Sequence, residues 1–242
     1  MKHTVFTNCN FPKRKSNEDT FCIVENFFED VNLYCIFDGH GGNEVSEYLK
    51  NNFPTILKEE LINQNFIFNE FDEDKWKKCL QNSFDKIEYE LKKCCDSGST
   101  LVVLMIDEDK YCYFANVGDS IGCILNEQIE EIGVKHRLNL ISEIERVEKN
   151  GGFVFKDRVN GILEISRAIG DFSMKPEVST EPYVKICKLD QNDKIILASD
   201  GLWDYVTLDE LFDFAKDNFD AEQIIDEFCH KSYDNITVIA IE

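Results

Sequence analysis

Runs of apolar residues that alternate with polar ones, or stand as short unbroken blocks, divide most of the chain into segments of strand length. Turn-forming residues separate several of these segments by only a few positions, and such short links predict antiparallel pairing. The predicted strands are Thr20–Glu25, Asn32–Phe37, Thr100–Ile106, Tyr111–Val117, Gly122–Leu125, Gln128–Ile132, Phe153–Phe155, Tyr183–Lys188, Lys194–Ala198 and Ile236–Ile241.

Apolar residues at three- and four-residue steps predict the helices. The longest such stripe begins after Asp72 and consists of Trp76, Leu80, Phe84, Ile87, Leu91 and Cys94. A helix is also predicted at Glu44–Asn52, where Pro54 interrupts or restarts it. Thr207-Leu208-Asp209-Glu210 has the form of a capping box. The remaining predicted helices are Ser142–Lys149, the one that the capping box starts and that runs to about Lys216, and Ala221–His230.

Antiparallel sheets with helices on their outer faces therefore define an α+β fold class. The 242 residues contain no internal repeat, no low-complexity tract and no Pro/Gly/Ser linker. We therefore expect residues 1–242 to form one domain.

The net negative charge of the chain limits the kinds of molecule that it can bind. The chain has 47 acidic and 26 basic residues and a formal net charge of −21. Nucleic acid binding requires a basic face, so we expect no nucleic acid partner. An anionic substrate would require bound cations that reverse the charge locally.

Cysteine placement and hydropathy indicate the compartment. Several of the ten cysteines lie inside apolar strands, and no C-x-x-C pair occurs. Such thiols behave as small hydrophobic residues, so we expect reduced cysteines and a cytoplasmic or nuclear location. No run of 18 apolar residues and no signal-peptide pattern occurs, so we expect no membrane span.

Acidic residues stand at the ends of four predicted strands. Asp38 follows the run Leu33 to Phe37 on a glycine-rich turn, and Asp200 follows Ile195 to Ala198. The pairs Glu18-Asp19 and Asp234-Asn235 precede strands. Asp-Gly is also an ordinary hairpin signal, but four such clusters favour a site for hard divalent cations, which prefer oxygen ligands.

Seven motifs in order resemble the type 2C metal-dependent protein phosphatases, the PPM family of serine/threonine phosphatases. They are Arg14…Asn17-Glu18-Asp19, Phe37-Asp38-Gly39-His40-Gly41-Gly42, Gly98-Ser99-Thr100, Ala115-Asn116-Val117-Gly118-Asp119-Ser120, Gly161-Ile162-Leu163-Glu164-Ile165-Ser166-Arg167-Ala168-Ile169-Gly170-Asp171, Leu197-Ala198-Ser199-Asp200-Gly201-Leu202-Trp203-Asp204 and Asp234-Asn235-Ile236-Thr237-Val238. The resemblance implies a central β-sandwich of two antiparallel sheets, flanked by α-helices on both sides.

The resemblance also implies two Mg²⁺ or Mn²⁺ ions and a water that they activate for attack on phosphoserine or phosphothreonine. Asp38 would bridge the ions, with Glu18 and the Gly39 carbonyl on one of them. Asp200 and Asp234 would hold the other ion. Phosphoprotein substrates are the expected partners, and we expect a monomer.

Other motif residues receive supporting roles. By resemblance Arg14 binds the substrate phosphate, although from spacing alone it is one base of Lys13-Arg14-Lys15. His40 is either a general acid or a turn histidine that bonds a neighbouring group. Asp19 is expected to orient the ligands rather than to bind metal. Gly98-Ser99-Thr100, Gly118-Asp119-Ser120 and Gly170-Asp171 are interpreted as architectural, and Arg167 as cleft-facing or part of a structural ion pair.

Two departures from the family pattern carry predictions. Lys135 replaces an aspartate that, with the equivalent of Asp204, supports a third ion in many members, so we predict that this third site is lost or weak. The segment between Asp171 and Tyr183, where the family has a longer flap, is short, which predicts an open cleft.

Two other functions stay open at this stage. A phosphatase fold without turnover could serve as a binding module, although the full set of expected ligands favours activity. A hydrolase of small phosphomonoesters is the second alternative, because an open cleft would admit such substrates.

Overall fold

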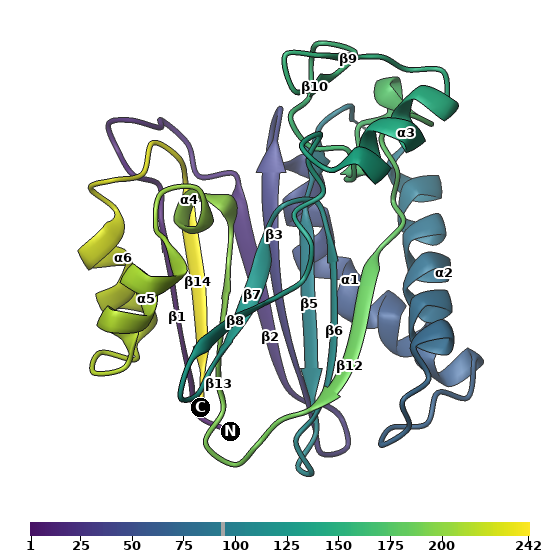
Figure 1. Cartoon of the computed structure of the whole chain (residues 1–242). Coiled ribbons are helices and arrows are strands. Elements are labelled where there is room, and N and C mark those ends of the chain that lie inside the picture. The colour runs from purple at the N-terminus through teal and green to yellow at the C-terminus, as the bar shows by residue number, and fades with distance from the viewer. Residues whose placement is uncertain (93–94) are drawn as a thin grey trace.

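The computed structural model describes residues 1–92 and 95–242, which form two antiparallel sheets stacked face to face (Figure 1). The first sheet has the order β1 (His3–Asn8), β14 (Ile236–Ile241), β13 (Lys194–Ala198), β7 (Ile121–Leu125) and β8 (Ile129–Ile132). The second has the order β11 (Ile169–Gly170), β4 (Gly98–Ser99), β3 (Val31–His40), β5 (Leu101–Ile106), β6 (Tyr111–Val117) and β12 (Tyr183–Lys188), and β2 (Asp19–Phe28) also pairs with β3.

Helices cover both outer faces of this sandwich (Figure 1). Helices α1 (Glu44–Asn63) and α2 (Glu73–Leu91) pack on the second sheet, and α5 (Leu208–Ala215) and α6 (Ala221–Phe228) pack on the first. Two short helices, α4 (Asp200–Trp203) and η1 (Phe172–Met174), and α3 (Ile141–Lys149) lie in the connections, as does the hairpin of β9 (Val154–Phe155) and β10 (Arg158–Val159). The predicted α+β sandwich with flanking helices is confirmed.

Strand β3 shows why the layers form. Its residues alternate between the two faces of the sheet, as the period of a strand requires. Leu33, Cys35 and Phe37 are buried with α1 and α2, while Tyr34 and Ile36 are buried between the sheets. A strand with apolar residues on both faces is stable only in the middle of such a stack.

The interruption predicted at Pro54 is wrong, because α1 continues through this residue to Asn63. Proline removes one helical hydrogen bond. Val45, Leu49, Phe53, Leu57 and Leu61 are nevertheless all buried at four-residue steps against the sheet. Burial of this stripe outweighs the missing bond, since each large apolar side chain contributes about 2 kcal/mol.

Helix α2 was predicted by its apolar stripe and begins where expected. The side chain of Asp72 accepts a hydrogen bond from the Lys75 amide at 2.9 Å and caps the helix. Cys94, the last residue of the predicted stripe, lies outside the described residues. The capping box at Thr207 is also present, with both of its reciprocal hydrogen bonds.

One strand at the start of the chain was not predicted. Residues His3–Asn8 form β1, an edge strand paired along its whole length with β14. Among the described residues, no helix is both long and apolar enough to cross a membrane.

Candidate metal and phosphate site

One cavity of about 240 Å³ collects residues from distant parts of the chain. Its lining includes every residue predicted to bind metal, to bind phosphate or to act as an acid: Arg14, Glu18, Asp38, Gly39, His40, Asp200 and Asp234. The two predicted supporting residues, Asp19 and Asp204, are not part of the lining. The fold therefore brings together acidic groups that the sequence places far apart.

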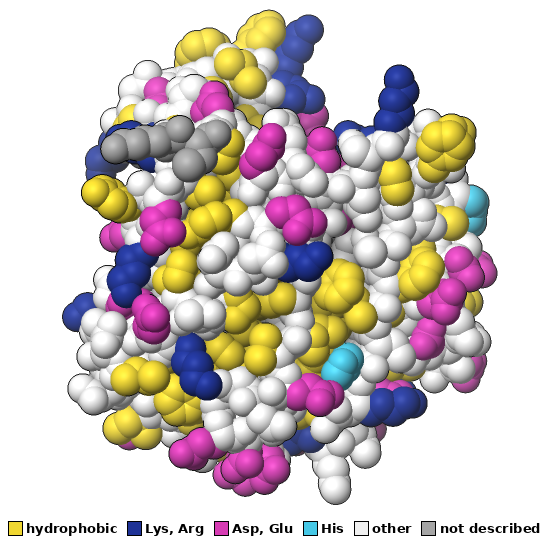
Figure 2. All heavy atoms as spheres, turned by 180° about the vertical axis from the view of Figure 1, so that it is seen from behind, with side chains coloured by type: hydrophobic (Ala, Val, Ile, Leu, Met, Phe, Trp, Pro, Cys, Tyr) yellow, Lys and Arg dark blue, Asp and Glu magenta, His cyan; other side chains and the backbone are white. Residues whose placement is uncertain are grey.

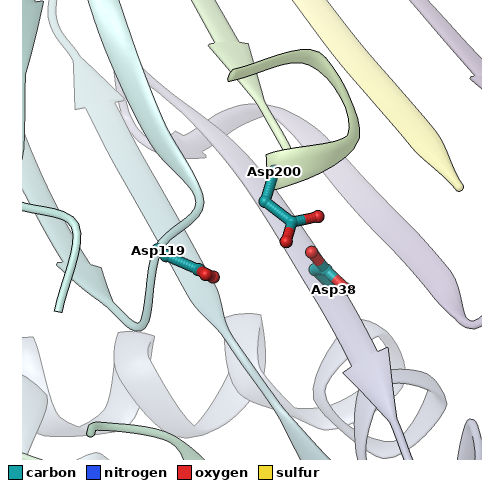
Figure 3. A group of neighbouring side chains, drawn as sticks. All are labelled: Asp38, Asp119 and Asp200. Atoms are coloured by element: carbon teal, nitrogen blue, oxygen red, sulfur yellow. The ribbon is translucent and has the colours of Figure 1, made fainter. Parts of the chain in front are cut away.

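Asp38, Asp119 and Asp200 form the centre of this site (Figure 3). Each offers a carboxylate oxygen, and these three oxygens all lie within 4.8 Å of one another. Asp38 is on β3, Asp119 follows β6, and Asp200 is the first residue of α4 after β13. The three carboxylates thus come from both sheets of the sandwich and point into a common space.

Backbone and hydroxyl contacts fix two of these three residues. The Thr100 hydroxyl accepts from the Asp38 amide at 3.2 Å, and the Thr100 amide donates to the Asp38 carbonyl at 2.8 Å. The same hydroxyl lies 2.8 Å from the hydroxyl of Ser120, the neighbour of Asp119. The motif Gly98-Ser99-Thr100 therefore positions the acidic residues, as its architectural interpretation requires.

Asp19 links the two sheets behind the cavity. It is 5% exposed, and its carboxylate accepts hydrogen bonds from the hydroxyls of Ser199 (2.7 Å) and Thr237 (2.8 Å). Ser199 directly precedes Asp200, while Asp19 faces Asp38 across the β2–β3 pair. The supporting role expected for Asp19 stays a prediction, and these contacts place it where it can orient both aspartates.

The carboxylates raise one another's pKa values. Burial, followed by the charges of Asp19 and Asp200, raises the pKa of Asp38 well above its ordinary value. Burial raises the pKa of Asp19 to about 6, although its two hydroxyl donors act in the opposite direction. Burial and the charge of Asp119 likewise raise the pKa of Asp200. Groups held this close without a counter-charge resist ionisation, and a divalent cation removes that cost. The donor set therefore fits Mg²⁺ or Mn²⁺.

The architectural interpretation of Asp119 is incomplete. Its carboxylate also reaches the acidic cluster and accepts from Arg137 Nε at 2.6 Å. A usable signal was present in the sequence, because Asp119 follows a buried strand and a glycine, much as Asp200 follows a strand end. Arg137 was missed altogether, since a basic residue in a loop has no distinguishing pattern.

Asp171 also has more than a turn-forming role. Its carboxylate Oδ2 lies 2.8 Å from Nε2 of His40, and the Asp171 side chain is 9% exposed. His40 thus bonds a neighbouring carboxylate, which was one of the two alternatives for this residue. An imidazole held by a carboxylate is also suited to carry a proton, so the contact leaves the acid role open.

Arg14 lines the cavity but is not free in it. Its guanidinium forms an ion pair with Asp234 Oδ2 and also donates to the Tyr233 carbonyl at 3.3 Å. The Arg14 side chain is half exposed. A phosphate at this position would therefore share the guanidinium with Asp234 or displace it.

The segments around the cleft differ in part from expectation. Arg158, Leu163, Glu164 and Ile165 line the cavity, whereas no residue of 172–182 does. The flap beside the site is therefore the β9–β10 region (Figure 1), and not the shortened segment that the sequence pointed to.

The structure shows the contacts of Arg167 and Lys135. Arg167 forms a structural ion pair with the buried Glu143 and does not line the cavity. Lys135 Nζ lies 3.8 Å from Asp204 Oδ1 and donates to the Trp203 carbonyl at 3.1 Å. Lys135 therefore lies beside Asp204, and the loss or weakening of the third ion stays a prediction.

The ends of several strands of this sandwich meet at a cluster of carboxylates, and an arginine and a histidine lie beside the cluster. This arrangement fits the class of metal-dependent phosphoester hydrolases. Comparison with known proteins identifies the family. The family model described as protein phosphatase 2C matches residues 4–240. This chain therefore belongs to the protein phosphatase 2C family.

Individual relatives agree. The chain is 34% identical to protein phosphatase 2C 77 of Arabidopsis thaliana over 77% of this chain and 46% of that protein. It is 32% identical to protein phosphatase 2C homolog 2 of Schizosaccharomyces pombe over 91% of this chain and 64% of that protein. The chain thus spans about half to two thirds of the length of these two relatives.

Solved structures share the fold. A Caenorhabditis elegans sex determining protein superposes with a TM-score of 0.86 and 26% identity, covering 100% of this chain and 64% of that one. A serine-threonine phosphatase 2C from Toxoplasma gondii superposes with a TM-score of 0.82 and 20% identity, covering 99% and 93%.

Proposed function

We propose that this chain is a Mg²⁺- or Mn²⁺-dependent protein serine/threonine phosphatase that hydrolyses phosphoserine and phosphothreonine in protein substrates. The single observation that carries the proposal is the convergence of Asp38, Asp119 and Asp200 in one cavity with Arg14 and His40. Membership of the protein phosphatase 2C family supports it independently.

Two ions have ligands available in this arrangement. Glu18, Asp38 and the Gly39 carbonyl would hold one of them, and Asp38, Asp200 and Asp234 would hold the other. Asp119 stands beside Asp38 and Asp200 and is a further candidate ligand. When bound, such ions supply a water of lowered pKa and offset the negative charge of a phosphoryl group.

The chain's own side chains would orient the ester and move the proton. The Arg14 guanidinium can take two phosphate oxygens once it shares or releases Asp234. Asp171 holds one nitrogen of His40 and thereby orients the ring. The second ring proton is then available for the serine or threonine oxygen as it leaves.

The carboxylates that line the cavity also repel anions. An anionic phosphate entering a cavity lined by Glu18, Asp38, Asp119, Asp200 and Asp234 meets repulsion from every one of them unless cations are present. We therefore expect the metal ions to be required for binding of the substrate as well as for its hydrolysis.

The decisive experiment measures phosphate release from a phosphoserine peptide with Mn²⁺ and with EDTA, in the native chain and in Asp200→Asn. We expect activity only with Mn²⁺ and a loss of at least about 100-fold in the variant, because a ligand of the ions is removed. Asp213→Asn is a matched control, since Asp213 is an exposed carboxylate on α5. Activity in EDTA, or an unchanged Asp200→Asn, would disprove the proposal.

The same assay separates the two alternatives. A binding module would bind the phosphopeptide with Mn²⁺ but release no phosphate. A hydrolase of small phosphomonoesters would turn over para-nitrophenyl phosphate without competition from the phosphopeptide. We expect the phosphopeptide to compete.

We further propose that residues 1–242 act as one monomeric domain in a reducing compartment, cytoplasmic or nuclear, without nucleic acid partners. The cavity draws on residues from both sheets, so neither half would form it alone. The nine described cysteines are all free thiols. On the face in Figure 2, the Lys and Arg side chains drawn stand mostly singly among acidic ones, without a continuous basic patch.

A further inference from the structure

Arg137 binds three aspartates, two of which, Asp119 and Asp200, belong to the acidic cluster. Its Nε donates to Asp119 Oδ2 at 2.6 Å, and its Nη2 donates to Asp200 Oδ2 at 3.1 Å and to Asp204 Oδ2 at 2.7 Å. The Arg137 side chain is 25% exposed, and it is not part of the cavity lining. One cation therefore binds three carboxylates at the side of the cluster that faces away from the cavity.

The surrounding loop fixes this guanidinium in place. The amide of the preceding residue, His136, donates to the Gly118 carbonyl at 3.0 Å, and the His136 ring nitrogen Nδ1 lies 2.9 Å from the same carbonyl. Arg137 itself forms an isolated bridge with Ile165. The loop that carries Arg137 is thus bound directly to the turn that carries Asp119.

Charge explains why a cation is needed there. Asp119 is 3% exposed, and Asp200 and Asp204 are about three quarters buried. Three such carboxylates around one space repel one another unless a positive charge lies between them. Lys135 approaches Asp204 alone, at 3.8 Å, so its ammonium cannot neutralise all three. The planar guanidinium reaches all three because its donors point in several fixed directions.

We propose that Arg137 is a positioning residue that takes the place of a divalent cation between Asp119, Asp200 and Asp204, and that it holds Asp200 for the ions shared with Asp38. The role in catalysis rests on the proposed phosphatase function, while the role in cation binding does not. Direct binding of substrate phosphate by Arg137 is disfavoured, because its Nε and Nη2 are engaged by carboxylates and it is not part of the cavity lining.

The test counts Mn²⁺ ions. Isothermal titration of the metal-free native chain and of Arg137→Gln gives the number of ions bound per chain. The amide of glutamine is neutral and short, so the variant leaves three carboxylates without their cation. We expect Arg137→Gln to bind one more Mn²⁺ per chain than the native chain does. Equal stoichiometry in a folded variant would overturn the proposal.

Thermal unfolding provides a second readout without turnover. We expect metal-free Arg137→Gln to unfold at a lower temperature than the native chain, and Mn²⁺ to raise its midpoint by more, because the added ion replaces the lost charge. Lys216→Gln is the matched control, since it also removes one positive charge but from an exposed pair with Asp213. An equal Mn²⁺-induced shift in Arg137→Gln and in the native chain would contradict the proposal.

A further variant keeps the proposal testable if Arg137→Gln fails to fold. Arg137→Lys retains the charge but not the fork of donors, so we expect its Mn²⁺ stoichiometry to equal that of the native chain while metal-free Arg137→Lys unfolds at a lower temperature; native unfolding of this variant would contradict the role of the fork. Where Arg137→Gln does fold, Asp119→Asn combined with it removes one carboxylate along with the guanidinium, so the additional ion should disappear. Retention of that ion in the double variant would place it elsewhere and refute the assignment.

Activity distinguishes the two proposals. Arg137→Gln is expected to need more Mn²⁺ for half-maximal phosphate release, at an unchanged KM for the phosphopeptide. A raised KM with unchanged Mn²⁺ binding would make Arg137 a phosphate ligand and overturn the proposal. If the native chain releases no phosphate at any Mn²⁺ concentration, the phosphatase function fails while the ion count still decides the role of Arg137.

Discussion

Gly201 has no room for a side chain, and this makes Gly201→Ala a sharp test of the site's geometry. A methyl group there would lie 2.9 Å from the carbonyl carbon of Asn235 and still closer to its carbonyl oxygen. Contacts of a Cβ below 3.0 Å are essentially never observed. The backbone of Gly201 and that of Asn235 would therefore have to move apart by about 1 Å.

This movement separates two expected metal ligands. Asp200 precedes Gly201, and Asp234 precedes Asn235, so the displacement acts directly between the two carboxylates. Overpacking of a buried site costs about 1–3 kcal/mol. A misplacement of about 1 Å at a catalytic site can lower the rate about 100-fold.

We expect Gly201→Ala to lower kcat/KM for a phosphopeptide about 100-fold and to weaken Mn²⁺ binding, with about 1–3 kcal/mol lost from the free energy of unfolding. Urea unfolding and phosphate release measure the two effects. Gly151→Ala is the control, because no atom lies within 4 Å of its added methyl group, although its φ is +95°. That variant should lose about 1 kcal/mol or more of stability through backbone strain but retain its activity. Native activity and native stability of Gly201→Ala would refute the geometric reasoning.

Three further predictions concern neighbouring groups. Gly98→Ala would push its methyl group against the His40–Asp171 pair, so kcat should fall at least about tenfold while Mn²⁺ stoichiometry stays unchanged. Arg14→Ala should lower kcat/KM by roughly 10- to 100-fold through KM, compared with the exposed neighbour Lys15→Ala, and an equal effect of both would deny Arg14 a specific role. Burial opposes ionisation of Glu143, but hydrogen bonds from Arg167 and Ser166 outweigh it and lower its pKa to about 2. This pairing contributes stability above pH 4.5 that is lost as the pH falls toward 2, about 3 kcal/mol in total, so Glu143→Gln should flatten urea unfolding midpoints between pH 5 and pH 3.

The periodicity of apolar residues predicted most of the helices and strands, because the residues of one element that face the core recur at regular steps along the sequence. The alternation along Asn32–Phe37 and the stripe from Trp76 to Leu91 each record which side of a local element meets the core. The capping box at Thr207 is likewise local, since its partners lie three residues apart. Pro54 shows the limit of local reasoning, because the helix continues through it on the strength of contacts with a sheet built from other segments.

The acidic residues at strand ends, Glu18, Asp38, Asp200 and Asp234, could also be identified from the chain alone, as could the family to which they belong. Whether each of them shares a cavity with the others could not. Asp119 has the same local pattern as a structural turn, and only the stacking of the sheets brings it within reach of Asp38 and Asp200.

Tertiary structure alone decided the partners of the cluster. Asp171 meets His40, and Arg137 meets three aspartates, through contacts between segments far apart in sequence. Burial produces a repeating pattern of apolar residues in each helix and strand, because many residues of the element face the core. The pairing of one guanidinium with particular carboxylates leaves no repeating pattern, because it depends only on where the folded backbone places single side chains.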